Sequence, residues 1–257
     1  MIILAIVAEK GGCAKTTTSA TLAAILAEQG KKVLCLDINE QGDLTDTLNT
    51  EPGTGGSLEL FEGTPAAELI RNTATKGIDV IAGTDSLATI EMKVSPERRD
   101  RPFILKAALK PLKRQYDYCI IDAPGNFNVA FLNALTAADS VIIPAQADYY
   151  SLKNITTLIK NIRFVKEELN PGLHVDGILL TRYQARRNVS KSAVDTLEAA
   201  REALGTRLFA ARIRENSKIA EAPGHKTTVI KYAPNSNGAA DYKEFAKEYM
   251  NILKGRN

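Results

Sequence analysis

The chain has 257 residues, of which 44% are hydrophobic and 25% are charged. This length supports one large domain or two small ones, and the composition excludes wholesale disorder, a collagen-like repeat and a coiled-coil rod. The 33 basic and 30 acidic side chains give a net charge of +3, which by itself gives little reason to expect a polyanionic partner.

The N-terminal apolar run, residues 2–8, lacks a basic segment before it and is too short to span a membrane. We expect it to form a buried first strand in a cytoplasmic protein. Cys13, Cys35 and Cys119 lie far apart and form no CxxC pair, so they predict neither a disulfide framework nor a zinc site.

Short apolar runs alternate with longer helical stretches along the rest of the chain. The predicted strands cover residues 2–7, 33–37, 78–83, 118–122, 140–145 and 175–181. The predicted helices cover residues 16–30, 106–113, 126–138, 152–169, 190–204 and 241–254. This alternation predicts an α/β fold in which a mostly parallel, twisted sheet carries helices on both faces, within a single domain of residues 1–257. The Gly- and Thr-rich residues 46–76 are expected to form an elaborated connection.

The sequence EKGGCAKTT, residues 9–17, stands between the first predicted strand and the first predicted helix. This is the context of a phosphate-binding loop: backbone N–H groups point at an anion, Lys15 reaches the β- and γ-phosphates, and Thr16 ligates magnesium. The generic pattern G-x-x-x-x-G-K-[ST] fails at both glycines, because Glu9 and Ala14 stand there. A Gly-rich turn that caps a helix is the alternative for this segment alone.

Several further motifs favour the phosphate site. KGGCAKTT resembles the deviant Walker A motif of ParA/MinD-type ATPases. Later segments resemble the family's other motifs in the family's order: 33–45 its second motif, 116–125 its Walker B and switch region, and 138–152 the segment after it. Residues 177–186 and 213–242 resemble the C-terminal third of the Soj-like ParA subgroup. The similarity covers nearly the whole chain, and it implies a P-loop NTPase fold.

The resemblance also implies a dimer that closes around two ATP molecules, with Lys10 crossing to the partner's phosphates. The nucleotide-binding residues that it implies are Lys10, Gly11, Gly12, Cys13, Ala14, Lys15, Thr16 and Thr17, with Arg182, Arg214 and Asn216 near the adenine. The implied catalytic residues are Lys10, Lys15, Asp37, Asn39 and Asp122, and the implied Mg²⁺ site comprises Thr16, Asp37 and Asp122, the last acting through water.

Two departures from the family bear on hydrolysis. Ala14 replaces a glycine, and it carries strain if the backbone there needs a positive φ. Asn39 stands where the family has its hydrolysis-critical acid, and it lacks the charge that orients or activates the attacking water. We therefore expect ATP-dependent dimerisation with slow hydrolysis, although Asp43 could compensate. Cys13 is either an oxidisable thiol with a lowered pKa or a variable small loop residue.

The charge is unevenly distributed. Residues 182–231 carry eleven basic and five acidic side chains, a net +6, which leaves −3 for the remainder. A solvated helix face explains this equally well from charge alone. The resemblance favours non-specific DNA binding through Arg186 and Lys218, with Arg187 and Lys191 beside them, by salt-dependent phosphate contacts.

These features lead to a functional hypothesis. The expected protein is a cytoplasmic, nucleoid-associated ATPase of plasmid or chromosome segregation, whose ATP-bound dimer coats DNA until a ParB-like centromere-binding partner stimulates hydrolysis. The alternative is a hydrolysis-deficient, nucleotide-gated DNA-binding scaffold or regulator. A membrane-associated ATPase is disfavoured because residues 248–257 do not form a basic amphipathic helix.

Overall fold

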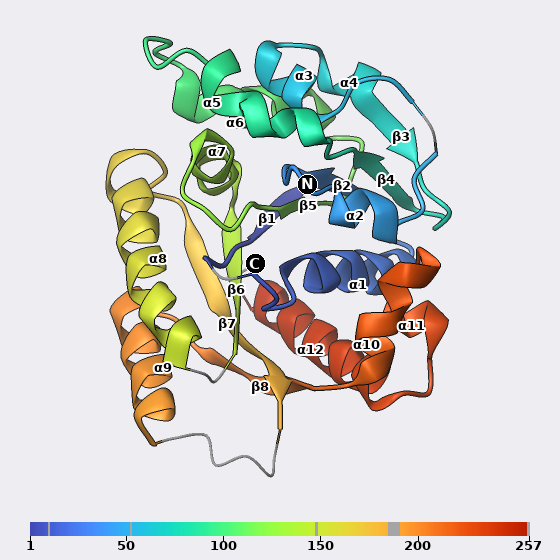
Figure 1. Cartoon of the computed structure of the whole chain (residues 1–257), viewed down its shortest axis with the longest axis vertical. Helices are drawn as coiled ribbons and strands as arrows, with labels where there is room; N and C mark the ends of the chain where they lie inside the picture. The colour runs from blue at the N-terminus through green and yellow to red at the C-terminus, as the bar shows by residue number, and fades with distance from the viewer. Residues whose placement is uncertain (10, 52, 147–148, 185–190, 256–257) are drawn as a thin grey trace.

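The computed structural model describes residues 1–9, 11–51, 53–146, 149–184 and 191–255, with the backbone alone for 149–154 and 191–196. Within these ranges, eight strands form one sheet in the order β3-β4-β2-β5-β1-β6-β7-β8 (Figure 1). The strands are β1 Ile2–Ile6, β2 Val33–Asp37, β3 Ile70–Asn72, β4 Ile78–Ile81, β5 Tyr118–Asp122, β6 Ser140–Gln146, β7 His174–Tyr183 and β8 Leu208–Arg214. Every neighbouring pair is parallel except β3–β4. The predicted mostly parallel α/β sheet is confirmed.

Helices cover both faces of this sheet. They are α1 Lys15–Glu28, α2 Asp43–Thr47, α3 Ser57–Glu62, α4 Ala66–Leu69, α5 Ile90–Lys93, α6 Ile104–Leu109, α7 Val129–Ala137, α8 Tyr149–Glu168, α9 Lys191–Leu204, α10 Ser217–Glu221, α11 Val229–Tyr232 and α12 Asn237–Lys254. Short 3₁₀ turns lie at η1 Asp85–Thr89, η2 Arg101–Phe103, η3 Lys110–Leu112 and η4 Ala222–His225. None of the helices in the described ranges is long and apolar enough to cross a membrane.

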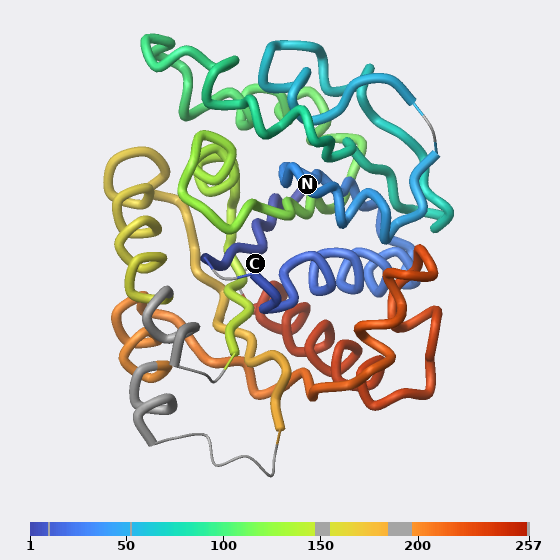
Figure 2. Tube along the Cα trace, in the orientation of Figure 1, coloured from blue at the N-terminus to red at the C-terminus, as the bar shows by residue number. Residues whose placement is uncertain are grey.

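The two faces of the sheet form two separate apolar clusters. Side chains alternate along β1, so that Ile3 and Ala5 pack against one layer while Leu4 and Ile6 pack against the other. The first layer contains α3 to α9, and the second contains α1, α2, α11 and α12. In the chain trace the C-terminal helix α12 lies beside α1 (Figure 2). Burial on both faces explains why the central strands are continuous apolar runs.

The structure adds elements to those predicted from sequence. Residues 46–76 contain α3, α4 and the antiparallel edge strand β3, in addition to the end of α2. The sequence analysis also missed β8, in which Phe209, Ala211 and Ile213 are buried and their neighbours are not. That period of two is the pattern of a strand with one covered face. Gly30, expected at the end of α1, has a φ of +79°, which suits a helix C-terminus.

Candidate active site

The segment between β1 and α1 forms the centre of the site. Gly12 and Ala14 have φ values of +75° and +69°, and α1 begins at Lys15 directly after them. The Lys15 side chain is buried, and its Nζ lies 3.6 Å from the position that a Cβ would take on Gly125. The sequence analysis expected strain at Ala14 if its φ were positive. The φ is positive, so the strain is present, because left-handed backbone disfavours any residue with a Cβ.

Two side chains from neighbouring strands hold this loop in place. Gln146 Nε2, at the end of β6, donates a hydrogen bond of 2.6 Å to the Gly12 carbonyl. Thr181 Oγ1, near the end of β7, donates to the Cys13 carbonyl at 3.0 Å. The sequence analysis missed both residues, although each follows an apolar run whose carboxyl end faces the loop.

Cys13 does not have the lowered pKa that one interpretation required. Its side chain is 2% exposed. Burial raises the pKa of the Cys13 thiol, and the positive charge of Lys15 offsets this only in part. Desolvation thus outweighs the favourable charge at the helix start, which favours the alternative that Cys13 is a variable small loop residue. All three cysteines are buried, and no disulfide joins them.

Two buried carboxylates lie side by side below the loop. Asp37 and Asp122 end the adjacent strands β2 and β5 and are paired in register. Asp122 accepts hydrogen bonds from Thr16 Oγ1 at 2.6 Å and from Ser19 Oγ at 3.0 Å. Burial, and then the charge of Asp37, raises the pKa of Asp122 well above its ordinary range. The phosphate loop thus adjoins a concentration of negative charge.

Asp37 is engaged by its own connecting loop. Its Oδ2 accepts hydrogen bonds from Thr45 N at 2.9 Å and Thr45 Oγ1 at 2.7 Å, and its Oδ1 accepts one from Asn39 N at 3.2 Å. Thr45 Oγ1 in turn accepts from Gly83 N at 2.9 Å. A Cβ on Gly83 would lie 2.6 Å from Asp37 Cγ, so only glycine fits there. Asp37 and Thr45 therefore fix the turn that carries Asn39.

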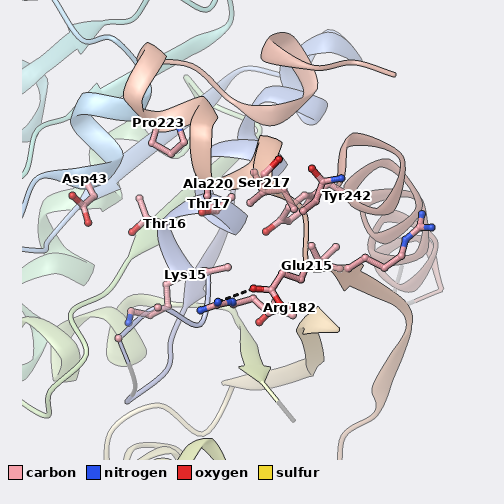
Figure 3. A pocket seen from close by; sticks show the side chains of 18 of the residues that line it. Lys15, Thr16, Thr17, Asp43, Arg182, Glu215, Ser217, Ala220, Pro223 and Tyr242 are labelled. Atoms are coloured by element: carbon pink, nitrogen blue, oxygen red, sulfur yellow. Dashed lines mark hydrogen bonds and ion pairs between the residues drawn. The ribbon is translucent and has the colours of Figure 1, made fainter. Parts of the chain in front are cut away.

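A cleft of about 620 Å³ opens above the loop (Figure 3). Its phosphate-loop lining comprises Gly11, Gly12, Ala14, Lys15, Thr16 and Thr17. The cleft is also lined by Asn39, Gln41 and Asp43. Asn39, which replaces the expected acid, therefore lies in the same cavity as Lys15. The remaining wall is Thr181, Arg182, Ile213, Arg214, Glu215, Asn216, Ser217, Ile219, Ala220, Pro223 and Tyr242.

The residues expected near an adenine are in this wall, and all three have partners within the protein. Arg182 forms a 2.8 Å ion pair with Glu215, drawn as a dashed line in Figure 3. Arg214 binds Asp241 through its guanidinium, with a closest distance of 2.6 Å. Asn216 Oδ1 accepts from Lys218 N at 2.9 Å and so caps α10. The sequence missed the apolar side of this wall, formed by Ile213, Ile219, Pro223 and Tyr242.

The residues expected at a DNA surface are only partly described. Lys10, Arg186 and Arg187 lie outside the described residues, as does the side chain of Lys191, whose backbone begins α9. Lys218 is described: its Nζ lies 2.6 Å from Glu221 Oε2 and 5.7 Å from the centre of the Tyr232 ring. Its charge is therefore already partly compensated by the protein.

The donor set constrains the kind of cation that the site could hold. In the described residues, no group of three His, Cys, Asp or Glu side chains is placed to bind a metal ion on its own. Thr16 and the Asp122 carboxylate nevertheless put oxygen atoms beside the phosphate loop. Magnesium suits such a site, since it takes few protein ligands and completes its shell with phosphates and water.

Known proteins share this architecture. The model of a family described as "AAA domain" matches residues 1–175. The sporulation initiation inhibitor protein Soj of Bacillus subtilis is 38% identical over 249 residues, which cover 96% of this chain and 97% of Soj. The chromosome-partitioning ATPase Soj of Thermus thermophilus is 35% identical, with 96% of this chain and 94% of that protein covered.

A solved structure resembles the whole chain as well. The cobyrinic acid a,c-diamide synthase of Mycobacterium smegmatis, solved with an ATP analogue and magnesium, superimposes with a TM-score of 0.85 at 30% identity and covers 100% of this chain and 97% of that one. The full-length similarity to the Soj proteins agrees with the motif order, the parallel sheet and the buried lysine of the loop. The chain belongs to the ParA/Soj family of partitioning ATPases.

Proposed function

We propose that the cleft binds ATP with its phosphates on residues 11–17 and its adenine against the wall around Tyr242. The observation that carries this proposal is the buried Lys15 side chain at the start of α1, beside the Thr16–Asp122 hydrogen bond. The backbone N–H groups of the loop and the helix start bind the phosphate oxygens, and Lys15 neutralises the β- and γ-phosphates. Asn216 and the apolar wall are the adenine contacts that remain available when Arg214 stays with Asp241.

Thr16 and Asp122 fit magnesium, with Asp122 acting through water. Held by these residues, magnesium would offset the negative charge of the nucleotide's phosphates. We assign Asp37 a positioning role instead of a metal-ligand role, since its carboxylate is bonded to its own connecting loop through Thr45 and Asn39, whereas Asp122 is bonded to Thr16, the other expected magnesium residue. The chain then has one hydroxyl and one carboxylate for the cation.

We propose further that ATP closes a homodimer in which Lys10 contacts the partner's phosphates, as the family motif implies. The ATP-bound dimer binds DNA without sequence preference through Arg186, Arg187, Lys191 and Lys218, and a ParB-like protein releases it. Nucleoid association follows from this DNA binding. The surplus of positive charge in residues 182–231 supports the DNA step, because phosphate contacts depend on charge and not on base sequence.

Hydrolysis is proposed to be slow. Asn39 lines the same cleft as Lys15 but offers no charge to orient the attacking water. Asp43 also lines the cleft and is exposed, so it is the carboxylate available to compensate. If Asp43 does not compensate, the protein is the alternative, a nucleotide-gated DNA-binding scaffold in which ATP locks the dimer.

Nucleotide titration tests the binding step. ATPγS with Mg²⁺ should bind the wild type and shift it to a dimer in sedimentation, whereas ADP should leave a monomer. Lys15→Ala should abolish binding, and Asp122→Asn should remove its magnesium dependence. Lys247→Ala, which changes an exposed lysine of α12 away from the cleft, is the matched control and should bind normally. A wild type that fails to bind ATPγS, or a Lys15→Ala variant that binds it normally, would refute the proposal.

A further inference from the structure

A second concentration of basic side chains lies outside residues 182–231. Residues 101–116 contain five basic side chains and no acidic one: Arg101, Lys106, Lys110, Lys113 and Arg114. This segment leads through α6 and η3 to the beginning of β5. The loops that precede β2 and β4 add Lys31, Lys32 and Lys76. Positive charge thus gathers where three neighbouring strands of the sheet begin.

Backbone hydrogen bonds join these three loops into one surface. Val33 N donates to the Gly77 carbonyl at 2.9 Å, and Asp117 N donates to the Lys32 carbonyl at 2.8 Å. Strands β4, β2 and β5 are adjacent and parallel, so their first residues lie at the same edge of the sheet. We call this surface the amino edge and define it by the exposed residues Lys31, Lys32, Lys76, Lys113 and Arg114.

The charges of the amino edge are not compensated within the described part of the chain. No ion pair there involves any of its five side chains. The acid in these loops is Asp117, whose Oδ2 accepts a hydrogen bond of 2.8 Å from Lys32 N. By contrast, Lys218 and Arg214 in residues 182–231 each pair with a carboxylate. The five basic side chains of the amino edge are therefore available for contacts with a ligand.

The amino edge also borders the basic segment of residues 182–231. Lys231 Nζ, in α11, donates a hydrogen bond of 2.8 Å to Thr75 Oγ1, next to Lys76. Figure 1 shows α11 beside the turn between β3 and β4 on the right-hand side of the molecule. The nucleotide cleft lies at the opposite, carboxyl ends of the strands. A ligand on the amino edge could thus reach Lys231 without covering the cleft.

We propose that the amino edge binds the phosphate backbone of duplex DNA and extends the DNA surface of residues 182–231; this rests on the proposed DNA binding. Long, exposed lysine side chains without carboxylate partners suit sequence-independent phosphate contacts. A protein partner would be expected to need a buried apolar anchor. In the described residues, the exposed large hydrophobic side chains are Met92, Phe103, Phe127 and Phe164, and none of them belongs to the amino edge.

A triple variant with one change in each loop tests this surface. Lys31→Gln, Lys76→Gln and Lys113→Gln together remove three charges, and the matched control changes Lys160, Lys166 and Lys247, exposed lysines of α8 and α12, to Gln. Binding of random-sequence duplex DNA is measured by fluorescence anisotropy with ATPγS between 50 and 300 mM salt, after circular dichroism has verified folding. The slope of log K against log[salt] should fall by about 2 to 3 in the edge triple, since each phosphate contact contributes about 0.9. Affinity near ~0.1 M salt should fall at least about tenfold, with ATPγS binding unchanged and the control triple like the wild type.

The comparison with Lys218→Glu separates the two proposals. If Lys218→Glu weakens DNA binding while the edge triple behaves like its control, the amino edge is refuted and the proposed function stands. If the wild type does not bind DNA even at 50 mM salt, both fail. An edge triple that retains DNA but loses binding to polyglutamate would assign the surface to an acidic protein and overturn the inference.

Discussion

Asp37 and Asp122 lie directly opposite each other on β2 and β5, and both side chains are fully buried. Burial raises the pKa of both carboxyls, the charge of Asp37 raises that of Asp122 further, and the charge of Asp43 adds to the rise at Asp37. Burying two carboxylates side by side costs free energy, and another interaction has to offset that cost for the pair to be retained in the fold. The phosphate loop, with Lys15 at its end, lies immediately beside the pair, which connects this cost to the binding of a cation and a nucleotide.

The pair should make the nucleotide-free protein more stable in mild acid. The pKa values are raised from 3.8 to about 6 for Asp37 and about 7 for Asp122, so the folded state binds protons that the unfolded state has released. Their contribution to stability is present below about pH 4 and is lost as the pH rises through 6 and 7. The urea midpoint, measured in EDTA, should therefore be higher at pH 5.5 than at pH 8.

Asp122→Asn is the control for this effect. It removes one charge of the pair while keeping an acceptor for the Thr16 hydroxyl, so its urea midpoint should change less between the two pH values than that of the wild type. Magnesium with nucleotide should also reduce the pH effect in the wild type. An equal pH dependence in the wild type and the variant would show that the buried pair is not its source.

Replacing Ala14 with glycine should relieve backbone strain in the loop and tighten nucleotide binding. At a φ of +69° an alanine costs about 1 to 2 kcal/mol, of which glycine's extra freedom in the unfolded state cancels about 0.5 to 1. We expect Ala14→Gly to raise stability by no more than about 1 kcal/mol and to tighten ATPγS binding several-fold, because the loop amides can then turn to the phosphates without strain. Urea unfolding and calorimetric titration measure the two effects.

Lys226→Gly provides the matched control, since Lys226 also has a positive φ, +50°, but does not line the cleft. It should change stability in the same direction and leave nucleotide affinity unchanged. If both variants alter affinity equally, the strain at Ala14 has no specific connection with the site.

The Thr45 hydroxyl should contribute measurably to the stability of the folded protein. This hydroxyl donates to Asp37 and accepts from Gly83 N, so Thr45→Val leaves the buried Gly83 N without its acceptor and removes one of the two Thr45 donors to Asp37 Oδ2. The cost should be about 1 to 3 kcal/mol in urea unfolding, whereas Thr45→Ser, which keeps the hydroxyl, should cost less. Equal losses in the two variants would attribute the effect to the methyl group and contradict this role.

Much of the fold could be predicted because the central strands are buried on both faces. Short, continuous apolar runs such as 33–37 and 118–122 are typical of strands buried on both faces, and both are strands with the bounds expected. β3 could not be predicted in this way, since Ile70–Asn72 is short and at most half-buried at the edge of the sheet. β8 alternates buried and exposed residues, but its outward positions include Leu208 and Ala210, so its first half does not alternate in polarity.

The functional site could be predicted only in part from the sequence, and the reason differs from that for the fold. Lys15, Thr16 and Asp122 are set by local motifs, and the structure brings them together. Gln146 and Thr181 act through tertiary contacts with loop carbonyls that no local pattern encodes. The pairing of Lys218 with Glu221, three residues along α10, could have been expected from helical spacing.

The steady-state ATP turnover of the wild type and of Asn39→Asp, each with DNA and a ParB-like partner, tests the central claim most directly. The account predicts slow turnover in the wild type and a clear increase in Asn39→Asp, because the new carboxylate would line the same cleft as Lys15. Asn39→Ala should show no increase. A brisk wild-type rate, or no gain in Asn39→Asp, would contradict the account.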